Sequence, residues 1–340
     1  MFFKSIIQGK LSFGTQRSFD KVVKMFEYRT ETYYKGDVML NKEDIFSEEE
    51  LILNVPRYVG NATDKNFKNT IDLLEYCAQF AVAGSIQAWM IEDGKVLNHA
   101  NIMPKSDRTV VTQFNKGEKL FRERGKNTEA LEAFSKTIET FDKHAQAYER
   151  RGWVNLFLRN YSDALYDFNK AIKIDDSIAY AHFGKGIIAM NEDNLEDAVE
   201  NFSNTVKKSV ALESLHWRGR LRKAECLIEL GEWEKAAFEL KFFTRRKFPA
   251  DDSNIRRRPR AFAMYGKVLY ELGQHEEALE MIETALSLKS EKTKQMNVGE
   301  ALYYRGLAKK ALGKKDFLAD VKSSADIGNE KAVQLLEELN

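Results

Sequence analysis

The pattern that most constrains the fold is a pair of small residues twelve positions apart, repeated along the chain. A glycine or alanine comes first and an alanine follows: Gly152 and Ala164, Gly186 and Ala198, Ala224 and Ala236, and Gly266 and Ala278. Four positions after each alanine stands a large apolar residue, namely Phe168, Phe202, Leu240 or Ile282. Because residues three or four apart lie on one face of a helix, each copy predicts two helices that approach closely at the small residues. The bulky side chain then fills the groove beside the crossing.

Weaker copies flank this set on both sides. The upstream copy has Ala130, Phe134 and Thr137, and the downstream copy pairs Gly306 with Leu318 at the alanine position. One hairpin of this kind buries too little apolar surface to be stable alone, so neighbouring hairpins must stack into a continuous core. Extra residues lengthen the connections between the later hairpins, where insertions often gather along one binding edge: Lys207–Leu215, Thr244–Arg260 and Leu288–Glu300.

This spacing resembles the tetratricopeptide repeat, a helical hairpin with a small residue on its first helix and alanine and aromatic residues on its second. The resemblance covers roughly residues 112–340. It implies a mainly α protein, in which five to six hairpins over residues 109–326 form a right-handed α-α superhelix. Residues 327–340 are then a capping helix with a polar face, which such solenoids need for solubility. The proline that usually ends the family's repeat is replaced by Asp142, Asp176 and Val210.

Residues 1–108 do not follow this period and predict a small α+β domain of unknown role, packed against the first repeat. The predicted elements are helices over residues 18–34 and 64–83, a strand over 51–55, and a β-hairpin of 85–91 with 95–102. We expect Ser18 to cap the first helix, Pro56 to end the strand and Gly84 to stop the second helix. The Asp93-Gly94 dipeptide between two apolar runs is a strong hairpin signal.

Composition and charge exclude several classes of protein. The chain has 53 basic and 52 acidic residues, a formal net charge of +1, so no global field attracts nucleic acid or an anionic membrane. Two cysteines, Cys77 and Cys226, are too few for a disulfide framework and fit a reducing compartment. The first residues lack the long apolar region of a signal peptide, and no stretch has the length of a membrane span. We therefore expect a cytoplasmic protein without a membrane segment.

The sequence carries no recognised catalytic constellation. Phosphate-binding loops, dinucleotide fingerprints and nucleophile elbows are absent, and the five histidines are scattered singly, without metal-ligand spacing. Cys77 lies on the apolar face of its predicted helix, and His99 is its only local candidate partner for a catalytic role. The sequence therefore predicts no enzyme activity, no cofactor and no metal site.

The resemblance implies a partner-binding stripe along the concave face of the first helices. In this family, those positions form a groove that suits an amphipathic helix or an extended peptide. Gln146 and Glu225 occupy such positions, and Phe183 and Ile187 can equally well pack against the adjacent hairpin. The candidate partner-binding residues are Glu149, Trp153, Tyr180, Phe183, Ile187, Arg218, Arg222, Arg260, Lys267 and Tyr270.

Arginines concentrate in residues 210–262, which carry 13 basic and 8 acidic residues. Arg218 and Arg222 are four residues apart, so both guanidinium groups can reach one anion. Family members that grip a partner's terminal carboxylate also need a lysine where this chain has Glu149. The favoured interpretation is a solvated face neutralised by glutamates such as Glu225 and Glu229.

The sequence as a whole predicts a non-catalytic scaffold or adaptor that binds a protein or peptide segment in the concave groove, with no nucleic-acid partner. Two alternatives stay open. One is anion or nucleic-acid binding through the arginine-rich residues 218–260. The other is an enzyme whose amino-terminal domain is catalytic. The sequence leaves the partner's identity and the oligomeric state undefined.

Overall fold

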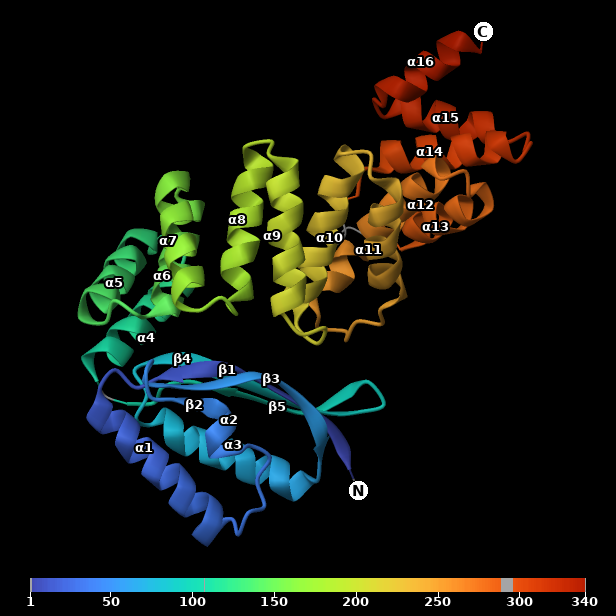
Figure 1. Ribbon diagram of the computed structural model, residues 1–340. Helices are drawn as coiled ribbons and strands as arrows, with labels where there is room; N and C mark the ends of the chain where they lie inside the picture. Colours follow the sequence, from blue (N-terminus) through green and yellow to red (C-terminus); the bar gives the residue numbers. More distant parts are fainter. Residues whose placement is uncertain (1, 107, 289–295, 340) are drawn as a thin grey trace. The chain divides into compact units, whose positions relative to one another are not determined.

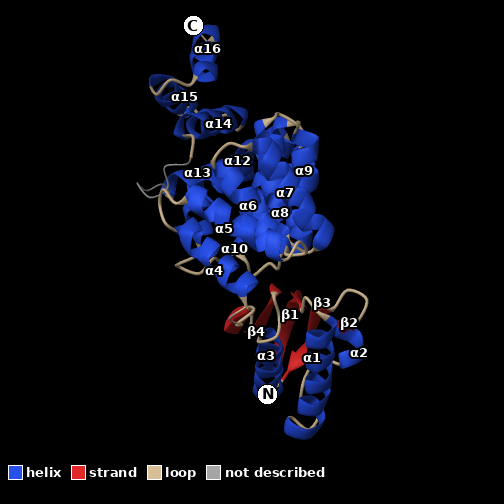
Figure 2. Cartoon of the chain, turned by 90° about the vertical axis from the view of Figure 1, so that its left-hand side faces the viewer, coloured by secondary structure: helices blue, strands red, loops and turns tan. Residues whose placement is uncertain are grey.

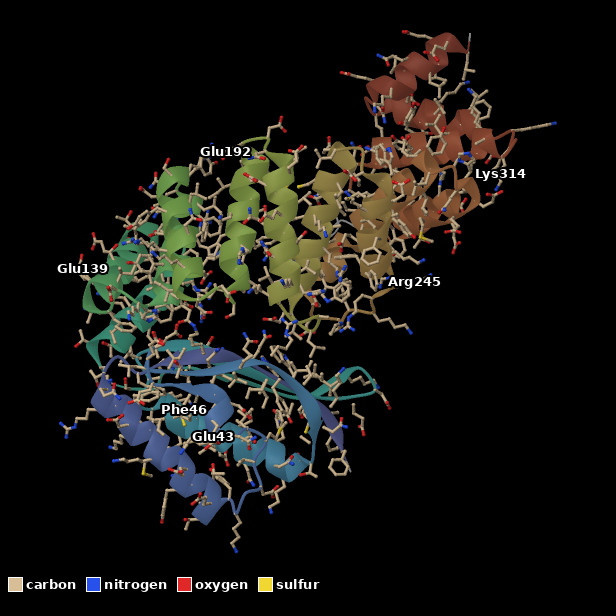
Figure 3. The ribbon with its side chains drawn as sticks, viewed as in Figure 1. Glu43, Phe46, Glu139, Glu192, Arg245 and Lys314 are labelled. Atoms are coloured by element: carbon tan, nitrogen blue, oxygen red, sulfur yellow. The ribbon has the colours of Figure 1, made fainter. Side chains whose placement is uncertain are left out.

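The computed structural model describes residues 2–106, 108–288 and 296–339. The chain forms two compact units, Met1–Ala181 and His182–Asn340. An antiparallel sheet and the first helical hairpins make up the first unit, and the described residues of the second unit form helices and their connections, without a strand (Figures 1 and 2). Charged side chains such as Glu192 and Lys314 project outward at the turns between helices (Figure 3).

The amino-terminal domain is a five-stranded antiparallel sheet in the order β2-β3-β1-β4-β5. Its strands are β1 (Phe3–Ser12), β2 (Phe46–Ser47), β3 (Ile52–Ala62), β4 (Ala83–Glu92) and β5 (Lys95–Ile102). Its helices are α1 (Gln16–Tyr28), a π-helical turn (Arg29–Tyr33), α2 (Lys42–Ile45) and α3 (Asp64–Ala78). Side chains of α1 and α3 such as Phe26 and Leu74 pack with Ile7 and Leu11 of β1, so both helices cover one face of the sheet (Figure 2). The predicted α+β domain is confirmed.

The predicted β-hairpin is also confirmed. Asp93 and Gly94 join β4 to β5 with φ values of 47° and 76°. Positive φ at both central residues is the geometry of the turn that matches the twist of an antiparallel pair.

The strand predictions were wrong in two places. The central strand β1 was not predicted, although it pairs with both β3 and β4. The strand predicted over residues 51–55 continues past Pro56 to Ala62. Proline is tolerated there because the register with β1 shifts between Val55 and Tyr58, and because β2 pairs only with the first two residues of β3.

The helix boundaries also differ from the prediction. Thr15, not Ser18, caps α1, and its hydroxyl oxygen accepts a hydrogen bond from the Ser18 amide. The helix predicted over residues 64–83 ends at Ala78, and Gly84 lies inside β4. Gly84 has a φ of 101°, and a Cβ atom there would lie 2.0 Å from the Lys10 carbonyl oxygen. Its role is therefore a close approach of two strands, which only glycine permits.

The remaining elements of the first unit are helices. They are α4 (Thr109–Arg122), α5 (Asn127–Thr140), α6 (Ala145–Phe157) and α7 (Tyr161–Ile174), followed by α8 (Ala179–Asn191), which begins in this unit and ends in the second. Gly117 packs against Phe134, where a Cβ atom would lie 2.6 Å from the ring. The sequence pattern did not predict this close pair, because it requires a small residue twelve positions before the alanine, and Gly117 is thirteen positions before Ala130.

The amino-terminal domain packs on these first hairpins, as predicted. Val82 of the sheet domain clusters with Val110 and Val111 of α4. The Gln146 side chain of α6 accepts a hydrogen bond from the Gly84 amide at 2.8 Å. Gln146, expected from the repeat pattern to face a partner, instead connects two parts of the first unit.

The second unit continues the hairpins. Its elements are α9 (Leu195–Lys208), α10 (Ser214–Glu229), α11 (Trp233–Arg245), a 3₁₀ turn (Ser253–Arg257), α12 (Arg258–Glu271), α13 (His275–Ser287), α14 (Val298–Ala311), α15 (Phe317–Asp326) and α16 (Glu330–Glu338). Gly186 packs against the Phe202 ring and Gly266 against Ile282. The predicted crossings at small residues are therefore present in this unit.

The last hairpin corrects one alignment. Leu318 does not occupy the alanine position, because its side chain is 37% exposed. Gly306 instead approaches the Phe317 carbonyl oxygen and the Val321 side chain, so the spacing is one residue shorter than in the other copies. After this hairpin, Gly328 adopts a φ of 88° and the short helix α16 follows, as the sequence predicted for a capping helix.

Candidate functional site

The candidate site is a cavity of about 460 Å³ in the second unit. It is lined mainly by α10, α12 and α14, the first helices of consecutive hairpins, with contributions from the end of α8 and the start of α9. Its apolar lining comes from Met190, Leu195, Ile228, Ala263, Met264, Met296 and Ala301. Its charged lining comes from Arg222, Glu225, Glu229, Arg260, Lys267 and Glu300. The cavity therefore combines apolar walls with charges of both signs.

Helical spacing brings these side chains together. On α12, Arg260, Met264 and Lys267 are four and three residues apart and so share one face of the helix. On α10, Arg222, Glu225 and Glu229 follow the same spacing. Of the ten candidate residues, the structure places Arg222, Arg260 and Lys267 around this one cavity.

Glu225 organises the positive charge of the site. Its buried carboxylate accepts a hydrogen bond from Arg222 Nη1 at 2.6 Å and lies 3.1 Å from Arg260 Nη2. One carboxylate thus holds two guanidinium groups, and both arginine side chains stay about a third exposed. Lys267 pairs with Glu300 at 2.7 Å on the other margin. At the arginine end of the cavity two cations thus share the Glu225 carboxylate, while the lining as a whole carries three cations and three anions.

A third arginine adds to this end. The pKa of Arg257 is lowered, chiefly by burial and then by the charges of Arg218 and Arg222. The Arg218 guanidinium lies 4.7 Å from the centre of the Phe183 ring. Arg218, Arg222 and Arg257 therefore influence one another electrostatically. The sequence analysis had placed Arg257 in the same arginine-rich region, residues 218–260, but had paired only Arg218 with Arg222 for binding one anion.

The other candidates of the second unit lie outside the cavity lining. Phe183 is only 2% exposed and its ring centre lies 5.4 Å from that of Phe202, which fits packing within the hairpin better than contact with a partner. Ile187 is half-buried. Tyr270 packs its ring against Tyr304, which lines the site and whose hydroxyl donates a hydrogen bond to Glu271.

Three candidates belong to the first unit. Glu149 is buried and its carboxylate accepts a hydrogen bond from Arg150 Nη1 at 3.0 Å. Burial raises the pKa of Glu149 to about 6 against the opposing effect of Arg150. Trp153 packs against Phe168, and the exposed ring of Tyr180 lies 5.8 Å from the Arg150 guanidinium.

The methionines of the cavity are the residues that sequence reasoning missed. Met264 could have been found, because it lies between Arg260 and Lys267 on the same helical stripe. Met190 and Met296 come from a helix end and a connection, where no periodicity points to the cavity.

The amino-terminal domain does not assemble the catalytic pair weighed from the sequence. Cys77 is buried among the core side chains between sheet and helices, and burial raises the pKa of its thiol to about 12. His99 stacks on Trp89, its neighbour across the β4–β5 pair. Side chains of consecutive residues in a strand point to opposite faces of the sheet. Met90 lies in the same core as Cys77, so Trp89 and the His99 ring stacked on it are on the face of the sheet opposite to Cys77.

Among the described residues, no group of three or more His, Cys, Asp or Glu side chains is placed to hold a metal ion. None of the helices in residues 2–106, 108–288 and 296–339 combines the length and apolar character needed to cross a bilayer.

Stacked hairpins that cross at glycine and alanine define a helical-repeat protein. Comparison with family models identifies the repeat: residues 119–177, 183–240 and 259–292 match the tetratricopeptide repeat. These three stretches of the chain are tetratricopeptide repeats, and the amino-terminal sheet domain is matched by no family model. No curated protein matches the chain.

Solved structures share the repeat fold at low sequence identity. YrrB, described as a tetratricopeptide repeat protein with an unusual peptide-binding site, is 18% identical with a TM-score of 0.51, and the match covers 61% of this chain and 99% of YrrB. PilF of Pseudomonas aeruginosa is 13% identical with a TM-score of 0.52, covering 67% of this chain and 97% of that one. These similarities concern the fold.

Proposed function

We propose that this protein is a non-catalytic interaction scaffold that binds a peptide segment of a partner protein in the cavity formed by α10, α12 and α14. The observation that carries the proposal is the convergence of three first helices on one cavity with apolar walls and charged margins. Methionine-lined walls adapt to different apolar side chains, because the thioether side chain is flexible and polarisable.

The charge distribution indicates which segment fits. An apolar side chain would enter between Met264, Met296 and Ala301, and an acidic group beside it would meet Arg222 and Arg260. A carboxylate there forms charge-assisted hydrogen bonds, which are stronger than those between neutral groups. The peptide-binding site named for YrrB is in keeping with this proposal but belongs to that protein.

The proposal extends to domain organisation and compartment. We propose that residues 1–108 form the amino-terminal domain, residues 109–326 the repeats and residues 327–340 the cap. A cytoplasmic location is supported by two buried free cysteines, Cys77 and Cys226, which fit a reducing environment.

The test uses the full chain as bait in affinity purification from its native cell, followed by quantitative mass spectrometry. The variant combines Arg260→Gln with Lys267→Gln, which removes two charges of the cavity and leaves Glu225 paired with Arg222. The matched control is Lys68→Gln, an exposed lysine of α3 that pairs with Asp64. We expect partners captured by the wild type and the control to fall about 10-fold with the double variant. Equal recovery with all three proteins rejects the cavity as the binding site.

A second function, binding of a phosphate-bearing anion at the same arginines, is favoured by the lowered pKa of Arg257. After burial, the charges of Arg218 and Arg222 contribute to this lowering of the Arg257 pKa, which indicates an accumulation of cations that an anion would relieve. The measurement is binding of a single-stranded oligonucleotide at increasing salt. Affinity that falls steeply with salt supports this function, because phosphate contacts release counterions. Undetectable or salt-independent binding excludes it.

A further inference from the structure

A second cavity lies on the other side of α10, between α9 and α11. Its volume is about 620 Å³, and none of its lining residues lines the cavity described above. Leu227 and Leu230 of α10 line this second cavity, whereas Cys226, Ile228 and Glu229 line the first. Helix α10 thus separates two cavities, and the second uses a face that the repeat pattern did not mark for binding.

The walls of this second cavity are apolar and include an exposed aromatic residue. Val199, Leu227, Leu230 and Phe238 contribute its large apolar side chains. Phe238 is 57% exposed, and Phe242, one turn further along α11, is 46% exposed. Their ring centres lie 4.9 Å apart. The buried residues of α11 are others, so both rings lie outside the core of the hairpin. Adjacent exposed aromatic rings beside a cavity are typical of an interaction surface.

The rim of the cavity is acidic. Four glutamates and two lysines line it: Glu196, Glu232, Glu234 and Glu239 with Lys223 and Lys235. Lys223 pairs with Glu239 at 2.9 Å and Lys235 with Glu232 at 2.8 Å. Glu196 and Glu234 have no ion-pair partner among the described residues.

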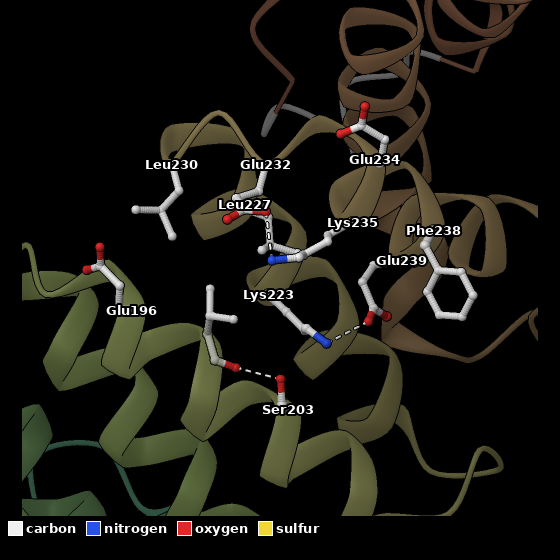
Figure 4. A pocket seen from close by; sticks show the side chains of 11 residues that line it. Glu196, Ser203, Lys223, Leu227, Leu230, Glu232, Glu234, Lys235, Phe238 and Glu239 are labelled. Carbon is white, nitrogen blue, oxygen red and sulfur yellow. Dashed lines mark hydrogen bonds and ion pairs between the residues drawn. The ribbon is translucent and has the colours of Figure 1, made fainter. Parts of the chain in front are cut away.

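The two uncompensated carboxylates stand on different helices. Glu196 belongs to α9 and Glu234 to α11, and Leu230 and Leu227 lie between them in the close view (Figure 4). The leucines and the Glu232–Lys235 ion pair are thus drawn between the two unpaired carboxylates in this view (Figure 4).

We propose that this cavity is a second docking surface, which binds a partner segment with one large apolar side chain flanked by lysine or arginine. The apolar side chain would pack against Leu227, Leu230 and Phe238. The flanking cations would meet Glu196 and Glu234, and a guanidinium or ammonium group can also stack on the open face of Phe238. Charge complementarity selects this occupant, because an acidic segment would meet two carboxylates that no lysine neutralises.

The test selects short random peptides displayed on phage against the full chain. Selections run in parallel on the wild type, on Phe238→Ala and on Tyr166→Ala, a control that removes a 55% exposed aromatic ring from α7. Both substitutions truncate exposed side chains and should leave the fold intact. We expect peptides that bind the wild type and the control but not Phe238→Ala to carry an apolar residue flanked by lysine or arginine.

Fluorescence anisotropy with the most enriched peptide then measures each contribution. We expect Phe238→Ala to weaken binding about 10-fold, and Glu196→Lys combined with Glu234→Lys to weaken it at least as much. The double variant Arg260→Gln and Lys267→Gln should leave the affinity unchanged, which separates this surface from the site of the proposed function.

Three results would overturn the proposal. The first is enrichment of peptides without basic residues, and the second is a set of peptides that Phe238→Ala binds as well as the wild type does. The third is a concentration-dependent dimer in analytical ultracentrifugation that Phe238→Ala dissociates, because the occupant is then a second copy of this chain.

Discussion

Replacement of Gly186 by alanine tests the packing on which every hairpin depends. A Cβ atom at Gly186 would lie 2.6 Å from Cε1 of Phe202, closer than real Cβ contacts allow. The Phe202 ring is fully buried and packs against Phe183, so it has no open space into which to move. The substitution must therefore displace a core side chain or separate the two helices.

Two opposing terms set the magnitude. Alanine gains about 1 kcal/mol over glycine inside a helix. Overpacking a well-filled core costs about 1–3 kcal/mol. Since the Phe202 ring cannot yield, we expect Gly186→Ala to lower the free energy of unfolding by about 1 kcal/mol. The matched control is Gly299→Ala in α14, where the nearest atoms would lie 3.5 Å from the new Cβ atom. At Gly299 only the preference of alanine over glycine in a helix applies, because the new methyl group meets no close neighbour. The free energy of unfolding should therefore rise.

The assay is urea unfolding of the full chain followed by circular dichroism. A decrease in stability shows as a lower midpoint at unchanged slope. The double variant Gly186→Ala with Phe202→Leu should recover part of the loss relative to Phe202→Leu alone, because the smaller side chain leaves room for the methyl group. If Gly186→Ala is as stable as the wild type while Gly299→Ala is stabilising, the close crossing does not limit stability and the reasoning is refuted.

Three further predictions concern the first unit and the cysteines. Burial lowers the pKa of His144 to about 3 from 6.5, so this side chain stays neutral in the folded state while it takes up a proton in the unfolded state. The free energy of unfolding should therefore fall as the pH drops below 6.5. The variant His144→Asn keeps a side chain that can cap the helix and should flatten this pH dependence in urea titrations. Cys77 and Cys226, whose pKa values burial raises to about 12, should react with a thiol reagent at neutral pH only after denaturant is added, and rapid modification of the native protein would contradict their burial. Gln146→Ala should remove the hydrogen bond to the Gly84 amide and lower stability by about 1–2 kcal/mol, measured by hydrogen exchange at Gly84; unchanged protection there would show that the bond does not form in solution.

The sequence by itself determined the repeats. Glycine or alanine at a crossing, with a bulky residue one turn beyond its partner, is a local requirement of close helix packing, so pairs such as Gly186 and Ala198 could be predicted from spacing alone. The same applies to the Asp93-Gly94 turn, because its backbone conformation depends on the two residues themselves. Residues close together in the sequence are enough to specify both the helix crossings and this turn.

The tertiary structure decided the features that depend on distant partners. Strand β1 became central only through pairing with β3 and β4, and Pro56 is tolerated because β2 pairs only with the first two residues of its strand. The first-helix positions that the repeat pattern assigns to partner binding include Arg222, Arg260 and Lys267. They could not show which side chains stay accessible, because Phe183 and Gln146 occupy positions of the same kind and contact other parts of the protein. Phe238 gave no signal in the sequence, since an apolar residue on a helix is exposed or buried only according to what the rest of the chain places against it.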